Sequence, residues 1–243
     1  QEAGELAEAE RCLEQSLTLA RALQRQMPDS SEALQDLAVT HRSLATLYAQ
    51  REELAGAETA LRESLELSKT LCQRRPDSSA AARGLYLSCS RLGGLAAQRG
   101  DVEKAVRLSE QALGLARALH RQTPSSPQTA EDLADALRGM GLLHLKRGQV
   151  SRSRDAYEEA VALADDLFRR QPESARRAQD LVNGLLGAAQ VMAAAGRGDR
   201  AQQYLARCHD PLRVLHGAGV LDHPYLQQLW RELEGRPQGA SPP

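Results

Sequence analysis

The residues of this sequence that could do chemistry are few, and they gather near its C-terminal end. Cys208 and His209 are adjacent, and Asp210 and His216 follow. A thiol beside an imidazole is the pairing of a cysteine nucleophile, and all three residue types are metal ligands. Small residues occupy the position of Cys208 earlier in the sequence, at Ser16, Ser64, Ala112 and Ala160. We therefore expect a packed thiol here, and we predict no catalytic site, no metal site and no cofactor.

The remaining polar candidates predict no enzyme either. Paired carboxylates such as Glu158-Glu159 and Asp165-Asp166 are neighbours along the chain, so on a helix they point in different directions and are expected to be solvated. His144 shares its position with Tyr48, Ala96 and Met192 and is expected to be half-buried. The sequence has no phosphate-binding glycine loop, serine elbow or metalloprotease helix motif.

The elements that hold these residues follow from a repeat with an interval of 48 residues. Residues of the same kind return at this interval. The prolines are Pro28, Pro76, Pro124 and Pro172, and the leucines are Leu37, Leu85, Leu133 and Leu181. A turn position holds Gly4, Glu52, Gly100, Gly148 and Gly196, and a small residue follows at Ala9, Ala57, Ala105, Ser153 and Ala201. A fixed period with this many matched positions is typical of a repeat array.

Each unit reads as two antiparallel helices. Between Pro76 and Gly100, apolar or small residues recur at spacings of three and four, which indicates an amphipathic helix. Ser78 can cap its start and Gly100 can end it in the left-handed conformation. A second apolar pattern then runs from Val102 to Leu119. Each helix spans about 20 residues, or roughly 30 Å.

The predicted fold is all-α, a right-handed superhelical solenoid of helix hairpins. An ordinary antiparallel bundle is the alternative, but a bundle has no reason to keep a fixed interval across four prolines. The expected parts form one repeat domain over residues 1–235: an orphan second helix at 5–27, repeats at 28–75, 76–123, 124–171 and 172–210, a capping helix at 222–234, and a disordered tail at 236–243. Because the first helix of the opening unit is missing, we expect the chain to be part of a longer protein.

The repeat resembles the tetratricopeptide repeat. One unit carries the spacing Leu92-Gly93, Ala96, Gly100, Ala105, Ser109 and Ala112, and the next carries Met140-Gly141, Gly148, Ser153, Tyr157 and Ala160. Small residues at these places let two helices approach closely. The resemblance extends to about residue 210. It departs in length, since a standard repeat has about 34 residues, and we interpret the excess as about two extra turns in each helix.

The resemblance implies a site on the concave face, which the first helix of each pair lines and which binds a partner peptide or helix. It places the following residues there: Arg42, Thr46, Arg91, Arg138, Leu142, Leu145, Leu186 and Gln190. Arg42 and Arg138 stand where co-chaperones of this superfamily use a lysine, but no asparagine follows four residues later, so we do not expect that carboxylate clamp. These surfaces suit a segment bearing leucines and a few acids. The open alternative is that the arginines are solvated and the leucines pack on the extra turns.

Composition limits the partners. The sequence has 31 basic and 32 acidic residues, which gives no field favouring nucleic acid or an anionic membrane. The four cysteines have no paired spacing, no apolar run spans a bilayer, and no signal peptide opens the chain. We therefore predict a cytoplasmic scaffold with a protein or peptide partner. The alternative function is structural or regulatory: the array packs on another domain of its own chain, or forms a homo-oligomer through the exposed face of residues 5–27.

Overall fold

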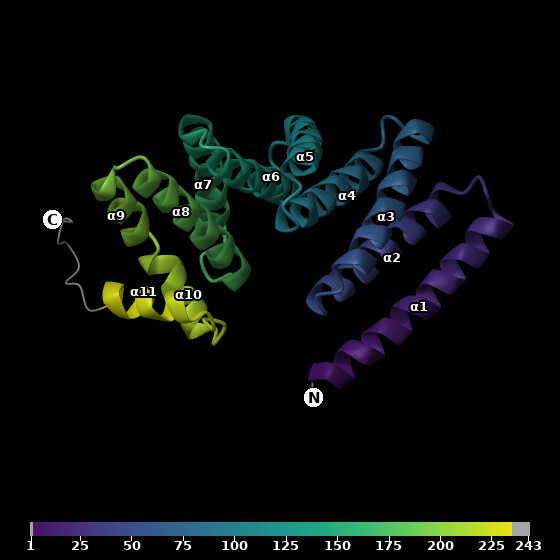
Figure 1. The fold of residues 1–243 in the computed structure, drawn as a ribbon, viewed down its shortest axis with the longest axis horizontal. Coiled ribbons are helices and arrows are strands. Elements are labelled where there is room, and N and C mark those ends of the chain that lie inside the picture. Colours follow the sequence, from purple (N-terminus) through teal and green to yellow (C-terminus); the bar gives the residue numbers. More distant parts are fainter. Residues whose placement is uncertain (1, 235–243) are drawn as a thin grey trace. The chain divides into compact units, whose positions relative to one another are not determined.

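A computed structural model of the protein describes residues 2–234, and in this part of the chain all regular elements are α-helices. The chain forms two compact units, which divide between residues 122 and 123 (Figure 1). In both units, most helices that are consecutive in sequence pack on each other. This confirms the predicted class, an all-α array of helix hairpins. The boundary of a single domain over residues 1–235 stays a prediction.

The first unit contains five helices. They are α1 (Glu2–Gln26), α2 (Ser31–Gln50), α3 (Leu54–Arg74), α4 (Ser79–Gln98) and α5 (Val102–Gln122). The pairs α2 with α3 and α4 with α5 are the predicted hairpins, and α1 packs beside α2. α2 and α4 have 20 residues and α3 and α5 have 21, in agreement with the predicted length.

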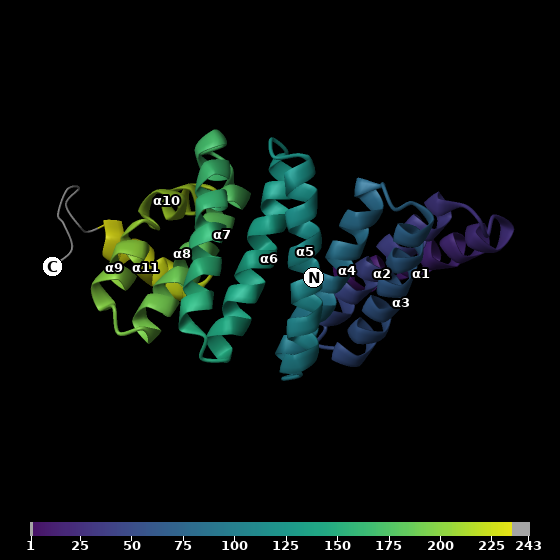
Figure 2. The ribbon, with the colours of Figure 1, turned by 90° about the horizontal axis from the view of Figure 1, so that it is seen from above.

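The second unit begins with two more hairpins. Its helices are α6 (Pro127–Lys146), α7 (Val150–Arg170), α8 (Ala175–Ala194), α9 (Gly198–Ala206), α10 (His209–Gly217) and α11 (Pro224–Glu234). Figure 2 shows α6, α7 and α8 alongside one another, and α8 also packs on α9 and α10. The apolar core of this unit runs from Tyr157 on α7 to Leu233 on α11.

The same local chemistry begins and ends the hairpins. Four serine side chains accept a hydrogen bond from the backbone N–H three residues on; they are Ser30, Ser78, Ser126 and Ser174. After each first helix the turn residue has positive φ, at Glu52, Gly100, Gly148 and Gly196. This conformation is free of strain for glycine but not for glutamate, because glutamate has a Cβ.

Glycines set the distance between helices around Tyr157 in the second unit. A Cβ added to Gly187 on α8 would lie 2.0 Å from Cε1 of Tyr157, and one added to Gly141 on α6 would lie 2.8 Å from its ring. The ring is buried between these helices. Larger residues at either position would force the helices apart, which explains the small residue beside Met140 in the repeat.

Three local features of the structure differ from what the neighbouring residues suggest. Gly4 lies inside α1, because Glu2 and Ala3 favour a helix and one glycine costs only about 1 kcal/mol. Pro211 does not end the regular pattern, because it sits in the first turn of a further helix, α10, where its missing N–H costs no hydrogen bond. At α11 the ring of His223, rather than Asp222, accepts a hydrogen bond from a helix N–H, that of Tyr225, at 3.2 Å.

The C-terminal helix buries the apolar face predicted for it, except at its first aromatic residue. Leu226, Leu229, Trp230 and Leu233 are buried in the core, whereas Tyr225 is 48% exposed. Trp230 packs on His209 and His216 of α10, with ring centroids 5.6 and 5.5 Å away. α11 therefore covers part of this core, and its role as a capping helix stays a prediction. The predicted tail at 236–243 lies outside the described residues.

Candidate partner-binding site

The first unit holds three of the predicted partner-binding residues, Arg42, Thr46 and Arg91, in one hydrogen-bonded group. Arg91 on α4 is exposed and crosses to α2, where its Nη1 donates to Thr46 Oγ1 at 2.6 Å and to the carbonyl oxygen of Arg42 at 3.1 Å. Arg91 and Thr46 thus lie together on the surface. Arg42 lies beneath them.

Arg42 is only 9% exposed, yet among the described residues its guanidinium has no carboxylate in ion-pair range. Its Nη1 donates to Ser64 Oγ at 3.3 Å and to Ser88 Oγ at 3.5 Å. Burial, with the nearby charges of Arg91 and Arg83, lowers the pKa of Arg42 to about 10. A buried cation held only by hydroxyl groups is expensive, and most buried charges have an opposite charge beside them.

A pocket of about 220 Å³ opens beside Arg42. It lies between α2 and α4, with α3 behind, and we call it the α2–α4 groove. Its walls carry small and apolar residues around the arginine. The lining residues are Gln35, Ala38, Val39, Arg42, Ser68, Leu71, Ala80, Ala81, Arg83, Gly84 and Leu87. The groove can therefore admit a side chain and offer it a positive charge.

The equivalent surface of the second unit, between α6 and α8, is occupied by carboxylates of the chain itself. Arg138, two intervals after Arg42, pairs with Asp135 at 2.5 Å and with Asp180 at 3.8 Å. Glu131 pairs with Arg176 at 2.8 Å and with Arg177.

The residues that correspond to these charges in the first unit are all uncharged. Gln35, Val39, Ala80, Ala81 and Gly84 stand in the places of Glu131, Asp135, Arg176, Arg177 and Asp180. All five line the α2–α4 groove. The sequence analysis missed this difference, although a comparison of positions two intervals apart carries the signal: an arginine is kept while its acidic partners are lost.

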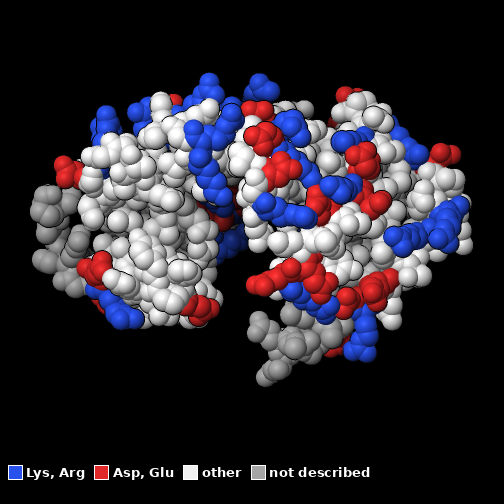
Figure 3. All heavy atoms as spheres, viewed as in Figure 1, with Lys and Arg blue, Asp and Glu red and all other residues white. Residues whose placement is uncertain are grey.

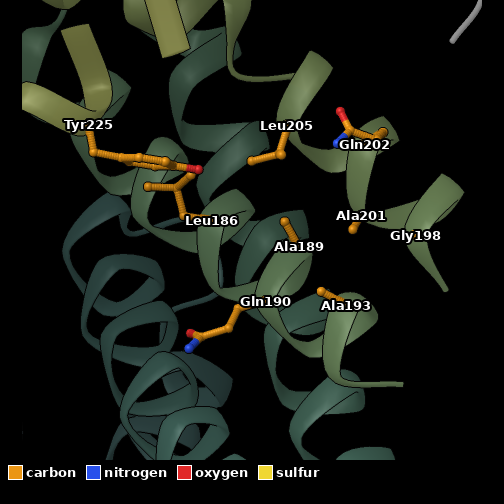
Figure 4. A pocket seen from close by; sticks show the side chains of 9 residues that line it. All are labelled: Leu186, Ala189, Gln190, Ala193, Gly198, Ala201, Gln202, Leu205 and Tyr225. Atoms are coloured by element: carbon orange, nitrogen blue, oxygen red, sulfur yellow. The ribbon is translucent and has the colours of Figure 1, made fainter. Parts of the chain in front are cut away.

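The other predicted residues lie in the second unit. Leu142 is 38% exposed, whereas Leu145 is half-buried against the core. Leu186 and Gln190 line a second pocket, of about 480 Å³, between α8 and α9. In Figure 4 the side chains of Leu186, Leu205 and Tyr225 point toward one another at one end of it. Figure 3 shows few charged residues over α8, α9 and α11 on the face drawn.

The cluster at Cys208, His209 and Asp210 is a packing site. Cys208 is fully buried, and burial raises the pKa of its thiol to about 12, so the thiolate nucleophile does not form at neutral pH. His209 contacts Asp210, with Nδ1 3.1 Å from Oδ1, and stacks near Trp230. His144 is half-buried, as predicted, with Nδ1 2.7 Å from Gln149 Oε1. Over the described range, no helix has the length and apolarity needed to cross a bilayer.

Hairpins of this kind, with open grooves on their first helices, define a helical-repeat protein. Residues 37–78, which include all of α3, match the tetratricopeptide repeat family. The chain therefore contains a repeat of the tetratricopeptide type, as its spacing predicts. Such repeats serve in general as scaffolds for protein partners.

Solved structures support the same fold. A putative kinesin light chain of Podospora anserina with nearly identical TPR-like repeats is 21% identical, with a TM-score of 0.55, and the match covers 90% of this chain and 91% of that one. BtubC (BKLC) of P. vanneervenii is 18% identical with a TM-score of 0.51, and the match covers 90% and 94% of the two chains. A comparison with curated proteins found no match. At these identities the likeness concerns the fold alone.

Proposed function

We propose that this chain is a non-enzymatic protein-interaction module, which binds an acidic peptide or helix of a partner protein along the face of its first helices. One observation carries the proposal. The α2–α4 groove keeps a buried arginine without a carboxylate, while the equivalent arginine of the second unit has two. A partner's Asp or Glu side chain would supply the missing charge.

The surroundings of the groove support a peptide ligand. Arg83 also lines the groove, and the exposed Arg91 and Thr46 lie next to Arg42, so a bound segment would meet further positive charge and a hydroxyl group. Apart from Arg42, Arg83 and Gln35, the groove walls are apolar or small, which suits leucine, valine or alanine beside the acid. In the second unit, Leu142 on α6 is exposed and offers an apolar contact of its own. The proposed partner segment is thus mainly apolar, with one or two acids.

The test is capture of partners from a cell extract by the wild-type chain and by Arg42→Met. Arg62→Met serves as the matched control, because Arg62 is an exposed arginine on α3 that pairs with Glu58 and lies outside the groove. We expect Arg42→Met to lose a captured protein that wild type and Arg62→Met retain. Circular dichroism of each variant establishes equal helix content. Partners retained by all three chains would place binding elsewhere.

A second candidate function is self-association through α1. Leu19 on α1 is 71% exposed and Val39 on α2 is 43% exposed, and both line a pocket of about 640 Å³ between these helices. Exposed apolar groups around a pocket of this size favour a protein contact. Sedimentation at increasing concentration, with Leu19→Glu as the variant, tests it. A wild-type dimer that Leu19→Glu abolishes is expected, and a wild-type monomer at all concentrations contradicts it.

A further inference from the structure

The pocket between α8 and α9 in Figure 4 lies where a following repeat would place its first helix. The second unit contains the arrangement for comparison, because α8 itself packs on the preceding hairpin, α6 and α7. Eight of the nine lining residues lie one interval of 48 after residues of that hairpin. They are Leu186, Ala189, Gln190, Ala193, Gly198, Ala201, Gln202 and Leu205, which follow Arg138, Gly141, Leu142, Leu145, Val150, Ser153, Arg154 and Tyr157.

In the preceding hairpin this surface touches α8. The backbone of α8 at Gly187 rests on the Tyr157 ring, which is buried, and Leu145 and Val150 pack against the same core. At the pocket, Leu205 is only half-buried in the place of Tyr157. Ala193 and Gly198, in the places of Leu145 and Val150, are exposed. The surface that receives a helix in one repeat is therefore open in the next.

α11 covers only the adjoining part of this surface. Its Trp230 packs on His209 and His216. These two residues lie one interval of 48 after Val161 and Phe168. In the preceding hairpin, Gly184 of α8 contacts Val161, so α11 takes the equivalent contact. The lining residues of α8 run from Leu186 to Ala193, which is about two turns of helix, or roughly 12 Å. The pocket is thus continuous with a contact that α11 already makes.

The lining also defines the chemistry of a helix that would bind here. None of the nine lining residues is charged, although two of their counterparts, Arg138 and Arg154, are. In the preceding hairpin, Arg138 pairs with Asp180 of α8. Leu186 stands in the place of Arg138, so the pocket has no cation at this position. Gln190 and Gln202 offer neutral hydrogen-bonding groups. An acidic or basic stripe would lose its hydration here without gaining an opposite charge.

We infer that this pocket binds an uncharged amphipathic helix of two to three turns from a partner protein, seated as α8 is seated on the preceding hairpin. Small residues of the helix would lie over Leu205, as Gly187 lies over Tyr157. An apolar side chain would fill the space between Leu186 and Tyr225. This site does not depend on the α2–α4 groove, and it takes a neutral helix, whereas the groove takes an acid.

The probe for the test is a stapled helical peptide with the sequence of residues 184–194, the part of α8 that matches the open surface. It contains no charged residue. Its binding to the whole chain is followed by fluorescence anisotropy and by the NMR signals of the Tyr225 ring. The blocking variant is the double substitution Gln190→Glu, Gln202→Glu, on the pocket wall. The matched control is Gln203→Glu, an exposed neighbour that does not line the pocket.

We expect the peptide to bind the wild-type chain and Gln203→Glu within twofold of each other, to shift the Tyr225 signals, and to bind the double variant at least tenfold more weakly. No binding, equal binding to the double variant, or unshifted Tyr225 signals would overturn the inference. Dimerisation of the free chain that the double variant abolishes would also overturn it, because the occupant would then be a second copy. Binding that survives Arg42→Met supports a site separate from the groove.

Discussion

Replacing Arg42 by methionine should stabilise the protein, although it removes a buried side chain and two hydrogen bonds. The guanidinium is 9% exposed, and burial, with Arg91 and Arg83 nearby, lowers its pKa from 12.5 to about 10. Keeping the charged form buried therefore costs roughly 3 kcal/mol at about 1.4 kcal/mol per pH unit. Its two hydrogen bonds are long, at 3.3 and 3.5 Å. Losing them destabilises the variant by about 1 kcal/mol, which offsets part of the gain from removing the charge.

The serines that hold Arg42 keep partners in the variant. Ser64 donates to the carbonyl oxygen of Ala38 at 2.9 Å, and Ser88 donates to that of Gly84 at 3.0 Å. Methionine also fills the space of the arginine stem. The free energy of unfolding should therefore rise by about 1–2 kcal/mol, because a buried charge gives way to an apolar group.

The matched variant is Arg138→Met, at the equivalent position of the second unit. It should lower the free energy of unfolding by about 1 kcal/mol, because it removes the cation that pairs with both Asp135 and Asp180. Burial already raises the pKa of Asp180, and Arg138 works against that rise. Urea unfolding followed by circular dichroism measures both variants. A loss of more than about 1 kcal/mol in Arg42→Met would refute the reasoning, because the arginine would then be a structural residue.

The pH dependence has a definite sign. A base whose folded pKa is lowered disfavours its charged form in the folded state, so the cost of Arg42 is fully present below that pKa. As the pH rises through about 10, folded Arg42 loses its proton and the cost falls. The stability advantage of Arg42→Met should therefore be constant near neutral pH and should narrow above about pH 10. Urea unfolding repeated at several pH values measures it.

Three substitutions and one labelling experiment also have predicted results. Glu52→Gly should raise the free energy of unfolding by about 1 kcal/mol, and Gly148→Ala should lower it by a similar amount, because both positions have positive φ. Thermal unfolding measures both variants. A change of stability in the same direction in both would contradict this. Gly187→Ala should cost about 1–2 kcal/mol, since the added Cβ would lie 2.0 Å from Tyr157; an unchanged urea midpoint would argue against the close helix contact. Cys208 should resist alkylation until the chain unfolds, as mass spectrometry can follow; rapid labelling of folded protein would disprove its burial.

Much of the fold could be predicted because its signals are local. Proline, serine and glycine act within one turn, so the start of α4 at Ser78 and its end at Gly100 follow from a few neighbouring residues. Local signals do not indicate α10, because a proline such as Pro211 is typical of a helix break. In the structure Pro211 lies in the first turn of α10, and this helix buries Leu212 and Leu215.

The site was harder to predict, because residues at equivalent positions have different surroundings. Arg42 and Arg138 are the same residue in the same place of the repeat. One is buried beside an open groove, and the other is paired with Asp135 and Asp180. One difference lies on the same helix, where Val39 stands in the place of Asp135, and the other lies on the neighbouring helix, where Gly84 of α4 stands in the place of Asp180 of α8. The pocket at Tyr225 likewise depends on α11, which lies outside the repeat.

The most direct test of the proposed groove is a double-mutant cycle between Arg42 and an acid of the captured partner segment. Affinities are measured by calorimetry for wild type and Arg42→Met, each with the acidic segment and with its amide counterpart. A desolvated ion pair predicts a coupling energy of about 1.5 kcal/mol or more. Coupling near zero, with the segment still bound to Arg42→Met, would contradict the role assigned to the α2–α4 groove.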